Sequence, residues 1–157
     1  MAESNELALA KTVYADLCET LEKRGLVFEK HDDALVITFS SVGEDFPIDF
    51  VLAVEAEPQL LRVYSRLPFT VPEDKRMDLA IATCVASYGL IDGNFDYDIS
   101  KGIIRFRLTA SFRESKIGSG LFDYLIGVSF FTIDKYNDKF FALSKGLMSV
   151  NDFIAQE

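Results

Sequence analysis

The clearest hydrophobic pattern in this sequence lies in its last third, where apolar residues recur at helical spacing from Leu121 to Met148. At 100° per residue, one group of them shares an arc of roughly 100°, which is about the width that a helix buries on a sheet. This group comprises Phe122, Leu125, Ile126, Ile133, Tyr136, Phe140, Leu143 and Leu147. We therefore predict a long helix, which Gly146 ends or bends, followed by a short last turn capped by Ser149.

This helix carries more apolar residues than one buried face requires. Phe130, Phe141 and Met148 lie on one shoulder of the arc, and Tyr124 and Phe131 lie on the other. Other parts of the chain can cover these shoulders, or the shoulders can meet a second molecule. Both interpretations remain open, and they make these five residues candidates for an interface, with self-association as the leading form.

Two more helices are predicted by the same spacing and by the residues at their ends. The first runs from a cap at Ser4 to about Arg24, and Gly25 stops it. The second begins at Pro72 and ends at Gly89, which we expect to adopt a left-handed cap. The residues expected on its buried face are Met77, Ala80, Ile81, Cys84, Val85 and Tyr88.

Alternation of apolar and polar residues predicts six strands. Four of them follow one another from Leu26 to Arg66 as a meander, whose first turn is at Asp32-Asp33. The order is therefore helix, four strands, helix, two strands, helix. Tight turns between strands favour an antiparallel sheet with the helices on one face, so we expect an α+β fold and a single domain over residues 1–157.

The last two strands form the clearest hairpin. Both must keep their apolar residues on one face, so the loop needs an even number of residues, and Lys101-Gly102 is the predicted turn. That register places Asp98 opposite Arg105 and Asp96 opposite Arg107, and opposite charges then meet across the strands.

Composition narrows the classes of partner. The formal net charge of −9 argues against nucleic acid and against anionic membrane surfaces, both of which need clustered lysine and arginine. The longest uncharged run, Leu79 to Ile91, is too short to cross a bilayer. Cys18 and Cys84 are far apart among apolar neighbours, as is typical of a reducing cytosol, so we expect a cytoplasmic protein.

No motif favours catalysis or metal binding. His31 is the one histidine and has no nucleophile motif near it, and two scattered cysteines make a zinc site improbable. The stretch from Asp92 to Asp98 begins like a calcium loop but has tyrosine where that loop needs glycine. The glycine-rich segment 116–120 lacks the strand that precedes a phosphate-binding loop. We expect no catalytic residue, no metal and no cofactor.

Arginines gather on the face of the sheet that points away from the helices. Arg62, Arg66, Arg105 and Arg107, with Arg113 beyond them, alternate with the apolar residues of their strands. This face can bind an anionic ligand or an acidic partner segment. Alternatively, the arginines pair with the aspartates and glutamates that alternate at matching depth, which is the interpretation we favour.

Several short motifs resemble the bacterial YbjN-like family. They are Val71-Pro72-Glu73-Asp74-Lys75-Arg76, Ala86-Ser87-Tyr88-Gly89-Leu90, Gly93-Asn94-Phe95 and Gly102-Ile103-Ile104-Arg105. The resemblance is strongest from about residue 67 to residue 111. It implies a fold similar to type III secretion chaperones, which are acidic, often dimeric proteins that bind partner segments. It carries no catalytic residues over to this chain.

The sequence therefore predicts a non-enzymatic interaction domain that is chaperone-like or adaptor-like and homodimeric, and that binds a protein segment not identified by the sequence. The alternative is a sensory or signal-transduction regulator that binds a small ligand, with an anion held by the outward arginines or by the loop at Gly118.

Overall fold

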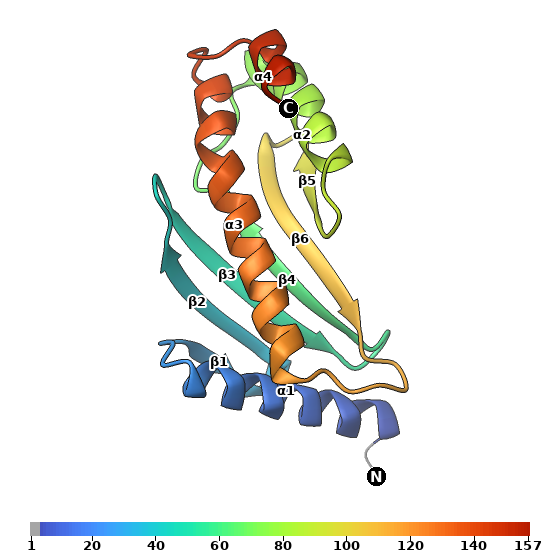
Figure 1. Ribbon diagram of the computed structural model, residues 1–157. Helices are drawn as coiled ribbons and strands as arrows, with labels where there is room; N and C mark the ends of the chain where they lie inside the picture. The colour runs from blue at the N-terminus through green and yellow to red at the C-terminus, as the bar shows by residue number, and fades with distance from the viewer. Residues whose placement is uncertain (1–3) are drawn as a thin grey trace.

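A computed structural model describes residues 4–157 as one antiparallel sheet covered on one face by helices (Figure 1). The six strands lie in the order β1-β2-β3-β4-β6-β5. The strands are β1 (Glu29–His31), β2 (Val36–Val42), β3 (Pro47–Glu55), β4 (Leu60–Arg66), β5 (Asn94–Asp98) and β6 (Ile103–Ser111). The helices are α1 (Asn5–Lys23), α2 (Arg76–Tyr88), α3 (Ser119–Ser144) and α4 (Val150–Gln156), with single 3₁₀ turns at η1 (Asp32–Ala34) and η2 (Glu73–Lys75). The predicted α+β class and element order are confirmed.

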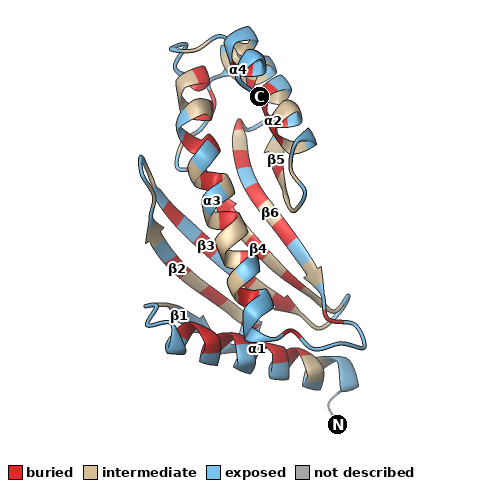
Figure 2. Cartoon of the chain, viewed as in Figure 1, coloured by how far each residue is buried: buried red, intermediate tan, exposed pale blue. Residues whose placement is uncertain are grey.

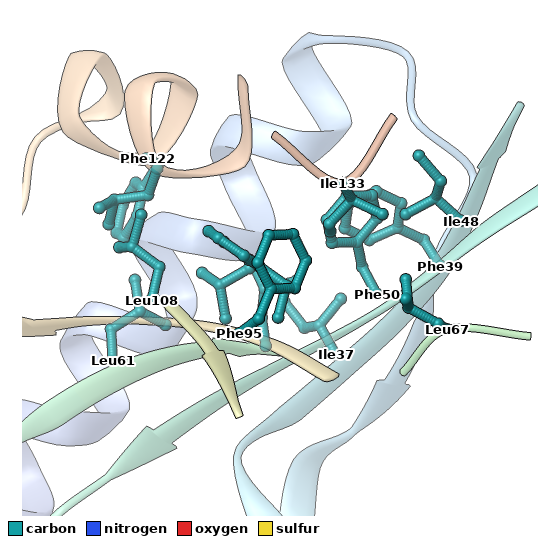
Figure 3. Packing of buried hydrophobic residues seen from close by; sticks show 14 of the residues in the cluster. Ile37, Phe39, Ile48, Phe50, Leu61, Leu67, Phe95, Leu108, Phe122 and Ile133 are labelled. Atoms are coloured by element: carbon teal, nitrogen blue, oxygen red, sulfur yellow. The ribbon is translucent and has the colours of Figure 1, made fainter. Parts of the chain in front are cut away.

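α3 crosses the inner face of the sheet and contacts β3, β4 and β6, while α1 lies across one end and contacts β3 and α3 (Figure 1). Along both helices, buried residues recur between exposed ones, so each helix has one buried side (Figure 2). Phe122 and Ile133 of α3 pack over strand residues such as Phe50 and Leu108, as Figure 3 shows. All four are at most 4% exposed, so one continuous core joins the helices to the sheet.

The structure corrects the predicted first strand and its turn. Leu26 and Val27 lie outside any strand and are exposed, and β1 has only three residues. The turn is the 3₁₀ helix η1, after which Leu35 adopts a left-handed conformation with φ of +52°. The remaining meander is confirmed, with Ile37 of β2 opposite Leu52 of β3 and Val63 of β4 opposite Leu52.

The hairpin between β5 and β6 has an even loop, as predicted, but the loop has four residues rather than two. Asp98 therefore lies opposite Ile103, and Asp96 lies opposite Arg105 rather than Arg107. The side chain of Asp98 closes this longer loop, because it accepts hydrogen bonds from the backbone N–H groups of Ser100 and Lys101 at 3.1 and 3.2 Å.

The predicted buried face of α2 is wrong for four of its six residues, whereas Ala80 and Val85 are partly buried and Val85 packs against the core. Met77, Ile81 and Tyr88 are 67%, 42% and 94% exposed, and Cys84 is also exposed. The buried residues are instead Leu79, Ala82, Thr83 and Ala86. Small side chains allow α2 to lie close to β5, α3 and α4, whereas the larger residues of the other face point outward.

Both predicted ends of α2 also need correction. A 3₁₀ turn follows Pro72, so the α-helix itself begins only at Arg76. Gly89 has φ of −82° and is right-handed, so it is not the left-handed cap that we expected. Gly93 takes the positive φ instead, at +75°, just before β5.

The end of α3 is set by Gly146, as predicted. This residue has φ of +71°, so the chain leaves the helix after Ser144. Leu147 therefore lies beyond the helix and is 78% exposed, which corrects its expected place on the buried arc. Ser149 caps α4 as predicted, because its hydroxyl accepts a hydrogen bond from the backbone N–H of Asp152 at 3.1 Å.

The short helix α4 is fastened to the core by one aromatic side chain. Phe153 is fully buried, and its ring centroid lies 5.7 Å from that of Phe140 and 6.4 Å from that of Tyr136. The Tyr136 hydroxyl also donates a hydrogen bond of 2.5 Å to the carboxylate of Glu157, which joins the end of α4 to α3.

We expect Phe153→Ala to lower the free energy of unfolding by about 3 kcal/mol, because it leaves a cavity beside two aromatic rings. Urea denaturation followed by circular dichroism measures this difference. Ile154→Ala, at a neighbouring position that is 44% exposed, is the matched control and should change stability by less than about 1 kcal/mol. Equal losses in both variants would show that α4 is not anchored by Phe153.

Candidate functional site

An apolar groove opens between α1, α3 and the end of the sheet beside β2. Its volume is about 380 Å³. It is lined by Leu21, Arg24, Leu26, Phe39, Ser41, Phe50, Asp123, Ile126, Gly127, Phe130 and Phe131. The two charged residues in this list form an ion pair between α1 and α3, so they neutralise each other at the groove. The rest of the lining is almost entirely apolar and suits hydrophobic side chains.

The wall of the groove contributed by α3 holds two of the predicted interface residues. Phe130 is partly buried against the core, whereas Phe131 is 72% exposed. Their ring centroids lie 5.5 Å apart in an edge-to-face arrangement. Gly127 lies one helical turn before them, and the absence of a side chain there leaves the groove open along the helix. An exposed aromatic side chain beside an apolar hollow is typical of a binding surface.

The structure places the other three candidates elsewhere. The ring of Phe141 packs against those of Phe46 and Phe69, with centroid distances of 5.3 and 5.4 Å. Met148 packs against the core, and Tyr124 donates a hydrogen bond to Asp92. Of the five residues, only Phe130 and Phe131 therefore share the groove. A role for the five in an interface stays a prediction.

The edge of the sheet beside this groove is partly unpaired. β1 pairs with β2 only at Val36, Ile37 and Thr38. The outer edge of β2 from Phe39 to Val42 has no strand partner within residues 4–157. Residues 26–28 lie beside this stretch, because they line the same hollows, but no backbone hydrogen bond is found between the two segments. The N–H and C=O groups of such an edge can pair with an added extended chain. Phe39 and Ser41 on this stretch also line the groove, so the edge and the groove are continuous.

A second exposed apolar surface lies on α2, and sequence reasoning missed it. We define the α2 stripe as Met77, Ile81, Cys84, Tyr88 and Ile91. Four of these are the residues wrongly expected in the core, and Ile91 just beyond the helix is 99% exposed. Their regular spacing was the available signal, but spacing alone does not say which of two apolar faces meets the sheet.

The outer face of the sheet carries the predicted arginines, and two of them have clear internal partners. Arg62 pairs with Glu55 at 2.9 Å and donates a hydrogen bond to the Tyr64 hydroxyl at 3.0 Å. Arg107 donates two hydrogen bonds to the carboxylate of Asp96, at 2.8 and 3.1 Å. With Arg105, which also pairs with Asp96, three of the four arginines match the interpretation of a surface whose charges are paired.

Asp96 also accepts a hydrogen bond from Arg105, at 3.0 Å. The hydrogen bonds from Arg107, and then those from Asn94 and Arg105, hold the pKa of Asp96 below its usual value although partial burial opposes the shift. Arg66 is exposed and makes no ion pair within 4.0 Å in the described part of the chain. The four arginines therefore do not share one environment.

The chemical groups that the sequence singled out lie apart from one another. His31 is exposed and lies 3.2 Å from the Thr38 hydroxyl, and Cys18 is buried in α1. Among residues 4–157, no three histidine, cysteine, aspartate or glutamate side chains are grouped so that they could hold a metal ion. Over the same residues, no helix combines the length and the apolar character needed to cross a bilayer.

Solved structures share this arrangement of sheet and helices. YbjN from E. coli superimposes with a TM-score of 0.59 at 13% identity, over 80% of this chain and 92% of YbjN. The ExsC–ExsE complex gives 0.59 at 15% identity, over 83% of this chain and 94% of the matched chain. The HopA1–SchA chaperone–effector complex gives 0.54 at 16% identity, over 88% of this chain and 99% of the matched chain.

The resemblance expected from the sequence is confirmed at the level of the fold. This chain folds like YbjN and like type III secretion chaperones. No protein-family model and no curated protein sequence matches it. At these low identities the similarity describes the backbone, so the function must be argued from the surfaces of this chain itself.

We expect Asp96→Asn to lower the free energy of unfolding by about 1 kcal/mol at pH 7, because charged hydrogen bonds to Arg105 and Arg107 are weakened. The pKa of Asp96 is lowered by folding, so this stabilisation is complete above the usual value of 3.8 and disappears as the pH falls through the lower folded value. The difference between the variant and the natural protein should therefore shrink below pH 3.8. Urea denaturation at a series of pH values measures it.

Glu114→Gln is the control, since Glu114 is exposed in the loop after β6. A difference for Asp96→Asn that does not change with pH would contradict the assignment of the effect to its charge.

Proposed function

We propose that this chain is a protein-binding domain that holds an extended apolar segment of another protein in the groove between α1 and α3, and that it acts as a homodimer. The proposal that the chain binds a protein segment rests on two neighbouring features, the apolar groove and the unpaired edge of β2. Phe131 is 72% exposed over an apolar hollow, and the unpaired stretch of β2 from Phe39 to Val42 lies beside it.

The partner binds as an added strand. Its backbone hydrogen-bonds to the free edge of β2, which provides affinity without regard to sequence. Because side chains alternate along a strand, every second residue of the partner points into the groove. There it packs against Ile126, Phe130 and Phe131, and the preferred residues are therefore aliphatic or aromatic.

Charge adds a second preference. Arg24 and Asp123 neutralise each other, so the groove itself favours neither sign. The chain as a whole carries 25 acidic residues against 16 basic ones, which favours partner segments with lysine or arginine beside the apolar residues.

The similar structures support a protein-binding role. Two of the three are complexes named for two proteins, ExsC with ExsE and HopA1 with SchA, and the second is named as a chaperone with its effector. Proteins with this backbone thus occur bound to other proteins. We extend that role to this chain because its own groove and strand edge have the features needed.

Peptides selected from a phage-displayed library of random extended segments should be rich in alternating apolar residues and should bind this groove. We expect Phe131→Glu to weaken such a peptide at least about tenfold, because a buried charge replaces an apolar contact. Fluorescence anisotropy measures the affinity.

Leu147→Glu is the matched control, because Leu147 is 78% exposed but lies beyond the far end of α3, outside the groove. The Leu147→Glu variant should bind the selected peptide with unchanged affinity. If both variants lose binding equally, or if no selected peptide is sensitive to Phe131, the groove is not the partner site.

The homodimer is argued from the α2 stripe. Within α2, Met77, Ile81, Cys84 and Tyr88 are spaced by four, three and four positions, which is the spacing that places apolar residues along a seam between two helices, and Ile91 follows just beyond the helix. The run from Leu79 to Ile91 has no charged residue, so the stripe is also the place where two acidic chains can meet with least repulsion. We therefore place the second copy on α2, and we assign Phe130 and Phe131 to the partner groove.

We expect the chain to be dimeric at micromolar concentration in light scattering and Tyr88→Glu to be monomeric, because each dimer would bury the new charge twice. Phe131→Glu is the control and should remain dimeric. In the natural protein, a short bifunctional thiol reagent should join two copies through the exposed Cys84 and not through the buried Cys18. A monomeric natural protein, or a dimer disrupted by Phe131→Glu alone, would contradict this placement.

A further inference from the structure

We propose that Arg66 and Arg105, on the outer face of the sheet, form a binding site for the carboxylate or phosphate group of a small organic acid. This site lies on the opposite face from the groove and does not depend on the proposed function. The two residues are direct cross-strand neighbours, because Arg66 of β4 is paired with Arg105 of β6.

Like charges in this position are unfavourable. Side chains directly opposite each other on antiparallel strands have Cβ atoms only about 5 Å apart, and two cations there destabilise the pair. The chain contains more acidic than basic residues, yet no carboxylate lies within 4.0 Å of the Arg66 guanidinium among residues 4–157. A bound anion between the two arginines would convert this repulsion into attraction.

The excess of arginines over carboxylates around Arg66 also favours an anion site. Arg62 is neutralised by Glu55, at 2.9 Å. Arg105 and Arg107 share the single carboxylate of Asp96, at 3.0 and 2.8 Å, and Arg66 forms no ion pair within residues 4–157. Three arginines therefore lie near two carboxylates, Asp96 and Asp49, because Asp98 pairs with Lys101. Asp49 lines the hollow beside Arg66, and the hydrogen bond that it accepts from Ser40 leaves its negative charge in place.

Arg105 is held in place for this role. Its Nε atom donates a hydrogen bond to Asp96, and its guanidinium carbon lies 5.1 Å from the centroid of the Tyr64 ring. The Tyr64 hydroxyl is in turn held by Arg62. None of the described hydrogen bonds uses the terminal Nη groups of Arg105, so they remain available for the two oxygens of a carboxylate or phosphate.

The surroundings of Arg66 suit an acid with an apolar body. A hollow of about 400 Å³ beside it is lined by Asp49, Val51, Arg66, Leu67, Pro68, Phe69 and Thr70. Its apolar residues can pack against a short hydrocarbon or ring, while Asp49 at its border disfavours a second negative charge on that side. The ligand class is therefore a small organic monoacid whose charged end faces the arginine pair.

The test is a calorimetric titration with two probes, benzoate and phenyl phosphate, each measured against sodium chloride of the same ionic strength. We expect saturable binding of at least one probe, and the stronger of the two identifies the acid group. Arg66→Gln and Arg105→Gln should each weaken that binding at least about tenfold, since each removes one guanidinium group that can form two hydrogen bonds with the acid. Arg113→Gln, which changes an exposed arginine beyond the end of β6, is the matched control and should leave it unchanged.

A second measurement needs no ligand. At low ionic strength Arg66→Gln should raise the melting temperature by about 1–3 °C, because it relieves the repulsion from Arg105, and the gain should fade in 0.5 M sodium chloride. The proposal is overturned if neither probe binds above the chloride baseline, if Arg66→Gln binds as well as the natural protein, or if Arg66→Gln does not raise the melting temperature at low salt.

Discussion

Burial of one face of α3 on the inner face of the sheet is the constraint on which the other features depend. Phe122, Ile133 and Phe140 are almost fully buried, and they bind the helix to strands from both halves of the chain. Burial of aromatic and aliphatic side chains of this size contributes about 2 kcal/mol for each. Once that face is fixed, the rest of the helix surface has a determined position, and Phe131 must point toward the gap beside α1.

The same constraint divides the apolar surplus of α3 into two parts. Phe141 is covered by Phe46 from the β2–β3 loop and by Phe69 from the segment after β4, so the apolar surplus near the end of α3 is covered within the chain. Nearer the middle of α3, Phe130 and Phe131 line the open groove, and Phe131 is 72% exposed. The short β1 leaves the adjacent edge of β2 unpaired as well. Side chains and backbone thus become available at the same place, which is what binding an extended segment requires.

Charge is arranged differently on the three surfaces. The groove contains one neutralised ion pair, the α2 stripe has no charged residue along Leu79 to Ile91, and the outer sheet face collects arginines in an otherwise acidic chain. Each surface therefore suits a different kind of partner: an apolar segment, a second copy of the chain, and a small acid. Because the first and last lie on opposite faces of one sheet, both can be occupied at once.

The sequence by itself determined the class of the fold, most of its elements, and which residues of every long strand face the core. Local signals suffice for these, as the caps at Ser4 and Ser149, the stop at Gly146 and the alternation in β3 and β6 show. Only the tertiary structure decided which face of α2 is buried. That helix has two apolar faces, and close packing selected the one with small residues, Ala82 and Ala86.

The same limit applies to the hairpin register and to the sites. Both strands keep their apolar residues on one face if the loop has an even number of residues, so loops of two or four residues are both allowed. The hydrogen bonds that the side chain of Asp98 accepts stabilise the longer loop. The candidate residues on α3 and on the outer strands were found from their periodicity. Their grouping depends on contacts between segments far apart in the chain, such as Arg24 with Asp123 and Arg66 beside Arg105, and the spacing of residues within one element contains no information about such contacts.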